Sequence, residues 1–217
     1  MKKIMMIAAM MVAAVTANAQ NEVGQLTLQP KVGLNIAKIT GGGNTRAGLV
    51  AGLEAEYGIA ENFGVTVGAL YSMQGTKRND DDSGVKTSVK FNIDYLNIPI
   101  LAQYYVIPGL AVKAGVQLGF VVRNKAKLDT NITGLVGFSD EGSINEFYDA
   151  FKQVPGLDIP EDAKLQKFDF SIPVGLSYEY ESFVLDARYN IGVSKVIKGY
   201  NDRNSVFQLT LGYKFAL

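Results

Sequence analysis

The sequence predicts an all-β protein: an eight-stranded antiparallel up-and-down transmembrane β-barrel with one long loop that carries a short helix. Three observations support this fold class. Eight segments alternate between apolar and other residues, as strands with two different faces do. The links between these segments alternate between short and long. The apolar face of every segment is free of charged residues, whereas the opposite face is rich in glycine.

Residues 1–19 have the parts of a secretory signal peptide. A lysine pair follows the first methionine, residues 4–15 form a short apolar run, and an A-x-A cleavage motif ends at Ala19. We expect cleavage before Gln20, which leaves residues 20–217 as one outer-membrane β-barrel domain. An N-terminal anchor helix is the alternative, but the apolar run is shorter than the roughly 20 residues that span a bilayer.

The composition excludes several classes of function. The chain has 21 basic and 21 acidic residues. Loss of the two signal-peptide lysines leaves a small net negative charge, which argues against a nucleic-acid partner. Because the chain has no histidine and no cysteine, Ser-His and Cys-His catalytic pairs and disulfides are impossible. Metal sites also lose their commonest ligand. We therefore expect no enzyme activity, no cofactor and no metal site.

The eight alternating segments each have about the length that crosses a bilayer at a tilt. In the first, Leu26, Leu28 and Val32 share one phase, and Gln29 and Lys31 share the other. The clearest later segments read LVAGLEAEYG, LAVKAGVQLGFVVR, FDFSIPVGLSYEY, FVLDARYNIGVS and FQLTLGYKFAL. In chain order, the expected strands cover residues 26–37, 48–58, 63–74, 95–105, 110–123, 168–180, 183–194 and 205–217.

Two of these segments contain irregularities. The apolar phase changes at Tyr95, because Phe91 and Ile93 lie in the opposite phase to the apolar residues that follow. We expect a β-bulge near Tyr95. Pro99 and Pro173 each fall inside an expected strand, where a proline removes one ladder hydrogen bond.

The links between the strands differ by end. Links after the second, fourth and sixth strands are tight, whereas the other links cover residues 38–47, 75–94, 124–167 and 195–204. Outer-membrane barrels have this layout, with short periplasmic turns and larger loops at the other end. Aromatic residues gather near the short-turn end, as in an interfacial girdle. They are Tyr57, Phe63, Tyr104, Tyr178, Tyr180, Phe183, Tyr213 and Phe215.

The face opposite the apolar one distinguishes a lipid-facing barrel from a soluble one. A soluble barrel would expose many Lys, Glu and Thr residues there, but glycine is frequent on this face. Five cations and five anions stand between the glycines, and we expect them to pair inside a crowded lumen without a pore. They are Lys31, Lys113, Arg123, Arg188 and Lys214, with Glu54, Glu56, Asp169, Glu179 and Asp186. The apolar face should then contact outer-membrane lipid; a soluble barrel or sandwich is the alternative.

The longest link, residues 124–167, contains a helical pattern. Ser143 and Glu146 have capping-box spacing. One helical face would carry Ile144, Phe147, Phe151 and Val154. A short helix with this face could pack on its own loop, plug the barrel mouth, or dock an envelope protein partner.

Three segments resemble conserved parts of the PorT-like outer-membrane β-barrel family, which is common in Bacteroidetes. They read KVGLNIAKI, YLNIPILAQYY and SYEYESFVLDARYNIGVS. The resemblance implies an eight-stranded outer-membrane barrel, and the family's namesake is a component of a protein-secretion machine. The link 124–167 matches none of the family's motifs. We expect a non-enzymatic structural or interaction protein of the cell envelope; the alternative is an envelope assembly or protein-secretion factor.

Overall fold

The computed structural model describes residues 23–40, 44–82, 85–132, 138–153 and 159–217. The expected signal peptide and its cleavage site between Ala19 and Gln20 lie outside these residues. The strands are β1 (Leu26–Ile39), β2 (Arg46–Ala60), β3 (Phe63–Asp82), β4 (Val85–Ile107), β5 (Leu110–Ile132), β6 (Phe138–Gly142), β7 (Phe168–Tyr180), β8 (Phe183–Gly192), β9 (Asn204–Tyr213) and β10 (Phe215–Ala216), and the helix is α2 (Ile144–Phe151).

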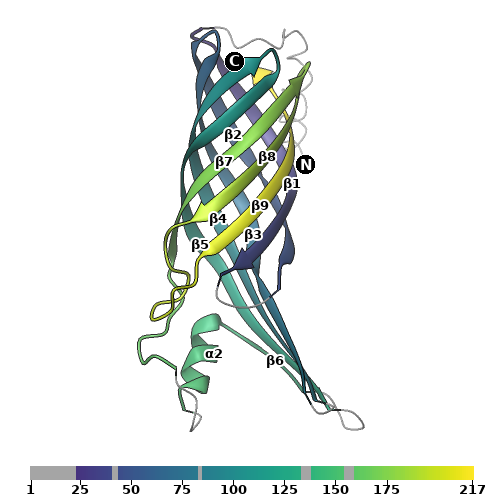
Figure 1. Cartoon of the computed structure of the whole chain (residues 1–217), viewed down its shortest axis with the longest axis vertical. Coiled ribbons are helices and arrows are strands. Elements are labelled where there is room, and N and C mark those ends of the chain that lie inside the picture. The colour runs from purple at the N-terminus through teal and green to yellow at the C-terminus, as the bar shows by residue number, and fades with distance from the viewer. Residues whose placement is uncertain (1–22, 41–43, 83–84, 133–137, 154–158) are drawn as a thin grey trace, which may run out of the picture.

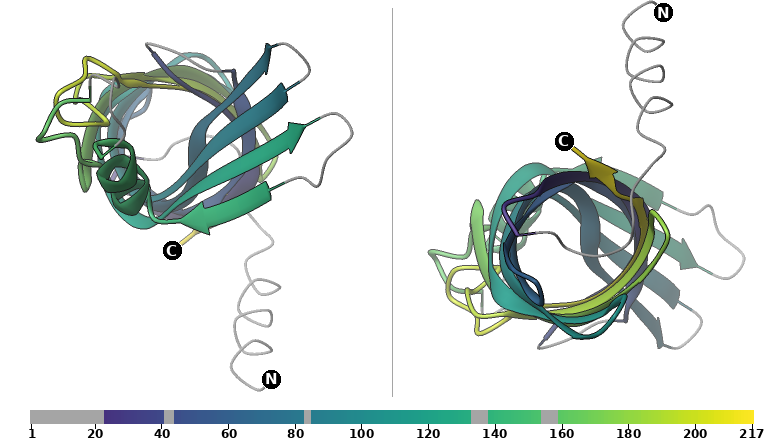
Figure 2. Two further views of the ribbon diagram at one scale, coloured as in Figure 1. Left: turned by 90° about the horizontal axis from the view of Figure 1, so that it is seen from below. Right: turned by 90° about the horizontal axis from the view of Figure 1, so that it is seen from above.

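Eight strands form the wall of a closed antiparallel barrel (Figure 1). Each of β1 to β5 and β7 to β9 pairs with its neighbour along the chain, apart from the inserted β6. The ring closes because β1 pairs with β9 from Lys31↔Gly212 to Ile39↔Asn204, and with β10 beyond that. The ring is visible along the barrel axis in Figure 2. The predicted fold class is confirmed, and closure satisfies the edges that an open sheet would leave unpaired.

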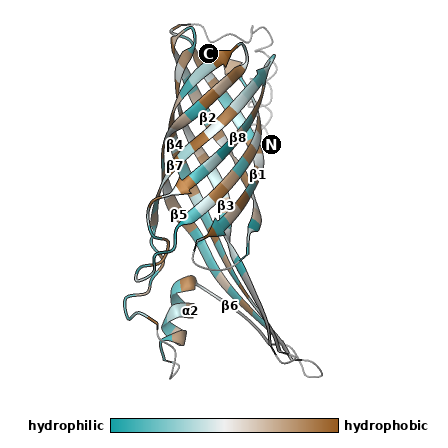
Figure 3. Ribbon diagram, viewed as in Figure 1, coloured by the Kyte–Doolittle hydropathy of each residue, from teal (hydrophilic) through white to brown (hydrophobic). Residues whose placement is uncertain are grey.

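The two faces of the wall lie as their alternation predicts. Leu53 is 49% exposed, whereas the next residue, Glu54, is only 1% exposed. The predicted aromatic girdle is also on the outside, with Tyr57, Tyr104 and Tyr178 among the exposed residues near the short turns. Hydrophobic and hydrophilic residues therefore alternate along the strands of the wall (Figure 3).

Three strands are longer than the alternation predicts, and this corrects two expected loops. Residues 75–82 of β3 and 85–94 of β4 pair with each other, so the expected link 75–94 is a long hairpin. Residues 123–132 of β5 add a third strand, and β6 adds a fourth. Hydrophobic alternation weakens here because the segment is mostly polar, while backbone pairing continues. We call these paired segments of β3, β4, β5 and β6 the extension; it slants away from the barrel (Figure 1).

A β-bulge separates the barrel from the extension in the β4–β5 ladder. Tyr95 pairs with Val121, but Asp94 pairs with Arg123, so Val122 has no partner in this ladder. The bulge was expected near Tyr95, and the extra residue proves to lie in β5. In β4 the alternation continues without a break: Ile93 and Tyr95 are buried on the inner side. The apolar phase changes because the inner side of β4 has different surroundings in the barrel and in the extension.

Each in-strand proline coincides with an interrupted ladder. Pro99 pairs with β5 on one side, while the β3–β4 ladder skips residues 68–69 on the other. Pro173 pairs with β8, and the β5–β7 ladder skips residues 115–116. The side of each proline that lacks an N–H donor therefore lies at a gap in the pairing. This explains how both prolines fit into the barrel wall. Among the described residues, no helix has the length and apolar character to span a bilayer.

Candidate functional site

Five charged side chains meet in the middle of the lumen, and we call them the central cluster. They come from four strands: Lys31 of β1, Glu54 of β2, Lys113 of β5, and Asp186 and Arg188 of β8. The inner face of each strand carries them, because inward-facing residues alternate with the outward-facing ones. All five side chains are almost completely buried.

Arg188 is the centre of this cluster. Its Nη1 and Nη2 donate to the two carboxylate oxygens of Glu54 at 2.6 and 2.7 Å, and Nη2 also donates to Asp186 at 2.7 Å. Two parallel bonds from one guanidinium fix both side chains in one geometry. Gly175 provides the space beside Arg188, since a Cβ there would lie 2.9 Å from the arginine Cγ.

The two lysines complete the pairing of the carboxylates. Lys31 Nζ lies 2.6 Å from Glu54 and 3.6 Å from Asp186, and Lys113 Nζ lies 3.1 Å from Asp186. The cluster thus joins three cations to two carboxylates. Ions buried in this way are retained only when each has close partners. These contacts connect the walls of the barrel across its interior.

A second group lies nearer the short turns. Lys214 Nζ lies 2.9 Å from Glu179 and 3.0 Å from Glu56. The Tyr105 hydroxyl lies 2.6 Å from Glu179, and Gln103 donates to Glu56 at 3.1 Å. Two carboxylates share one cation here, which offsets the extra cation of the central cluster.

The other two expected members of the luminal network behave differently. Asp169 is buried and accepts a 2.9 Å hydrogen bond from Ser194; no cation lies within ion-pair distance of it among the described residues. Arg123 is a correction: its side chain is 56% exposed, and its guanidinium lies 3.9 Å from the Asp94 carboxylate. The bulge at Val122 explains this, because one extra residue turns Arg123 out of the luminal phase.

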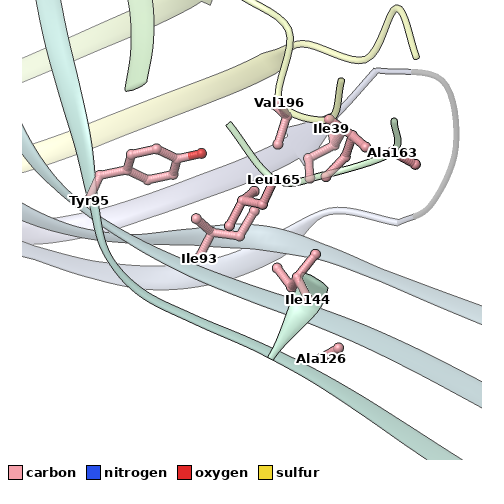
Figure 4. Close-up of a cluster of buried hydrophobic side chains, with 9 residues drawn as sticks. Ile39, Ile93, Tyr95, Ala126, Ile144, Ala163, Leu165 and Val196 are labelled. Carbon is pink, nitrogen blue, oxygen red and sulfur yellow. The ribbon is translucent and has the colours of Figure 1, made fainter. Parts of the chain in front are cut away.

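At the long-loop end of the barrel, apolar side chains form a separate core. Strand β4 contributes Ile93 and Tyr95, which point toward Leu165 and Val196 of two neighbouring loops (Figure 4). We call this cluster the loop-end core. Its buried members are Ile39, Ile93, Tyr95, Ala126, Ile144, Ala163, Leu165, Val196 and Ile197.

Helix α2 packs into the loop-end core and is capped as its sequence predicts. Ser143 Oγ accepts from the Glu146 N–H at 3.2 Å, and the Glu146 carboxylate accepts from the Ser143 N–H at 2.8 Å. Ile144 is 1% exposed, and its N–H donates to Asn124 of the extension at 3.1 Å. The helix therefore packs on its own chain.

The remaining members of the expected helical face are less enclosed. Phe147 meets Phe91 of β4 edge to face, with ring centroids 5.3 Å apart, and stacks on Phe151 at 4.4 Å. Val154 lies outside the described residues. Tyr148, which the predicted face omits, contacts Phe91 on one side and Tyr200 on the other.

A cavity of about 320 Å³ lies between α2, the extension and the loop before β9. Its walls are mainly apolar and aromatic, and Thr76, Tyr148, Tyr200 and Asp202 are polar members. Burial, followed by the nearby Tyr200 and Asp202, raises the pKa of Tyr148 to about 12. Burial also raises the pKa of Asp202. Sequence analysis missed this cavity because its aromatic residues come from three separate segments.

A family described as the outer membrane protein beta-barrel domain matches residues 18–198. The chain belongs to this family. It is therefore an outer-membrane protein, and by the usual layout of such barrels the long-loop end faces out of the cell. Nothing in this match is specific to the PorT-like family that three segments resemble.

Several solved outer-membrane proteins are similar to the chain. Ail, the attachment invasion locus protein of Yersinia pestis, matches 89% of this chain and 100% of its own, with 15% identity and a TM-score of 0.42. Neisserial surface protein A matches at 14% identity over 88% and 96%, with a TM-score of 0.44. OprG from Pseudomonas aeruginosa matches at 16% identity over 92% and 99%, with a TM-score of 0.41. A comparison with curated proteins finds no match.

Proposed function

We propose that this protein is a non-enzymatic interaction protein of the cell envelope. The barrel anchors it in the outer membrane, and the extension with α2 binds an envelope protein partner outside the barrel. The observation that carries this proposal is the division of the molecule into a lumen closed by ion pairs and an outer part with its own packed core.

The lumen supports an anchoring role for the barrel. The central cluster ties β1, β2, β5 and β8 together across the interior through contacts of 2.6 to 3.6 Å. Its carboxylates and amines are already partnered, so they are poorly suited to acid–base chemistry on a substrate. Among the described residues, no group of acidic side chains is arranged to hold a metal ion.

The outer part supports a binding role. The extension projects beyond the wall, and the loop-end core fixes α2 and two loops against it. Rigid elements that present a defined surface bind partners with less loss of conformational entropy than mobile loops do. Asp149, Ala150 and Gln153 are exposed on or just after α2 and lie on this surface.

A role in envelope assembly or protein secretion is the second candidate, because three segments resemble the PorT-like family. Such a factor would contact periplasmic machinery and so use the short-turn end. The two roles therefore differ in the end of the barrel that contacts a partner.

In-cell photocrosslinking tests the proposal. A photoreactive residue would replace Asp149 or Gln153 at the outer end, or Glu61 in the short turn between β2 and β3. We expect a discrete crosslinked protein from the two outer positions and none from Glu61. Crosslinks from Glu61 alone would favour the secretion role, and the absence of crosslinks at all three positions would contradict both.

Two controls keep this experiment specific. Deletion of residues 133–162 removes α2 together with both outer positions, and it should leave a barrel that still inserts, because the wall strands hydrogen-bond to one another. The purified protein should also give no stable conductance in a planar bilayer. A steady pore current would show that the lumen conducts and would contradict the anchoring role.

A further inference from the structure

We propose that the cavity beside α2 binds a small organic cation, with its charged group next to Asp202 and the rings of Tyr148 and Tyr200, and its apolar body against Phe91 and Phe147. The cavity is partly open and has a volume of about 320 Å³. This lies at the lower end of the range for small-molecule sites.

The aromatic walls are the first support. Phe91 makes two ring contacts: it meets Phe147 edge to face at 5.3 Å and lies nearly parallel to Tyr148 at 6.3 Å. Tyr148 is in turn 6.2 Å from Tyr200. Four rings from β4, α2 and the loop before β9 thus line one cavity. Aromatic faces attract weakly hydrated cations through their negative quadrupole, and cages of such rings recognise quaternary ammonium groups.

Asp202 is the second and independent support. It lines the same cavity, and its carboxylate has no hydrogen bond or ion pair with any residue whose side chain the structure describes. Its backbone carbonyl accepts from Val196 N–H at 2.8 Å, which fixes its place in the loop. Burial raises the pKa of this carboxyl, and a bound cation would relieve that cost.

Neighbouring cations are engaged elsewhere or point outward. Lys198 pairs with Asp162 at 3.4 Å, and Lys90 pairs with Asp129 at 3.2 Å. Arg203 is exposed. An anion in the cavity would be repelled by Asp202, and a neutral apolar molecule would leave that carboxylate unpaired. A cation with an apolar body satisfies both the rings and the charge.

This inference goes beyond the proposed function and does not depend on it. The cavity is built from residues of this chain alone, so the isolated protein should bind the cation whether or not a protein partner exists. Failure of the crosslinking experiment would leave this proposal standing, and the reverse also holds.

Nuclear magnetic resonance titration of the full chain tests the proposal in neutral maltoside micelles, which contain no ammonium group. The probes are benzyltrimethylammonium, choline, and 3,3-dimethylbutan-1-ol, the uncharged isostere of choline. We expect saturable amide shifts around Tyr148, Tyr200 and Asp202 with both cations. The dissociation constant of choline should be roughly tenfold below that of the isostere, and benzyltrimethylammonium should bind more tightly than choline.

Matched variants locate the effect. Asp202→Asn removes the charge with little change in shape and should raise the dissociation constant of benzyltrimethylammonium by about tenfold. Tyr148→Leu should raise it several-fold while leaving the barrel folded. Glu61→Gln makes the same charge change in an exposed short turn at the opposite end and should have no effect.

Four results would overturn the proposal. They are equal binding of choline and its isostere, unchanged binding in Asp202→Asn, shifts confined to another part of the protein, and no saturable binding of either cation in the millimolar range. A shift in the unboiled gel band would show that a variant has misfolded. If Asp202→Asn misfolds, Tyr148→Leu provides the second test of the site.

Discussion

Strand β4 passes through two interiors of opposite chemistry. Within the barrel its inward side chains include Asn97 and Gln103, which are buried among polar groups. At the bulge and beyond it the same side carries Tyr95, Ile93 and Phe91, which pack in or against the loop-end core. The inner face of one strand is therefore polar at one end and apolar at the other.

The difference follows from what lies outside each part. Lipid surrounds the wall, so apolar residues face outward and polar groups must satisfy each other inside. Water surrounds the extension, so its apolar residues turn inward and are shielded by α2 and two loops. Alternation shows that a strand has two faces, and only the medium decides which face is apolar.

The strongest test of the luminal interior is Glu54→Leu. It would leave Lys31, Lys113 and Arg188 with Asp186 alone, and such an excess of buried charge should cost about 3–5 kcal/mol of barrel stability. Because the chain has no tryptophan, the urea dependence of the gel shift between folded and boiled protein can measure this.

Restoring the balance of charge provides the control. Glu54→Leu combined with Arg188→Leu returns the cluster to one more cation than carboxylates, and it should recover part of the lost stability. Arg188→Leu alone leaves two cations for two carboxylates, so we expect a smaller loss of about 1.5–3 kcal/mol from its charged hydrogen bonds. Equal losses in all three variants would contradict charge balance as the cause.

The neighbouring residue Leu53 tests the opposite face at the same depth. Leu53→Arg places a charge in lipid and should cost about 2–4 kcal/mol, or prevent insertion. Leu53→Phe keeps the face apolar and should be nearly neutral in the same urea experiment. A harmless arginine at this position would reverse the assignment of the two faces.

The loop-end core should respond to loss of an apolar side chain. Ile144→Ala leaves a cavity under α2, and we expect a loss of about 2 kcal/mol in the local opening free energy, near the lower limit for such changes because adjacent loops can relax. Hydrogen exchange across Ile144–Phe151 would show it as faster exchange. The barrel's urea midpoint should remain unchanged, as it should in the surface control Asp149→Asn.

The smallest expected effect concerns the helix cap. Ser143→Ala removes the acceptor of the Glu146 N–H and should destabilise α2 by about 1 kcal/mol. Ser143→Asp retains an acceptor and should behave like the natural residue. If both variants exchanged at the natural rate, tertiary packing alone would determine the stability of the helix.

The parts of the fold that depend on period-two alternation could be predicted from sequence. Leu53 and Glu54 occupy the expected faces, and Ser143 and Glu146 form the expected capping box. Arg123 could not be placed, because a single unpaired residue at the bulge changes the phase and leaves little trace in the pattern. The extension was missed because its residues are mostly polar, so backbone hydrogen bonds continue the strands where hydrophobic alternation weakens.

The cavity was missed for another reason. Phe91, Tyr148, Tyr200 and Asp202 come from three segments that meet only after the barrel closes. No spacing pattern in the sequence indicates that these three segments are neighbours in the structure. Local patterns such as the cap report local structure, whereas a site built from distant segments depends on topology.

The pairing of Arg188 with Glu54 also constrains how the chain folds. The two residues are 134 positions apart. They come together only when the end of the chain pairs with β1 and closes the barrel. A half-formed sheet would hold their charges without partners next to hydrocarbon, which is unfavourable. Contacts of such long range form slowly because the chain between them must first be ordered. We infer that strand closure and charge neutralisation occur in one cooperative step, so that partly inserted sheets are too short-lived to accumulate.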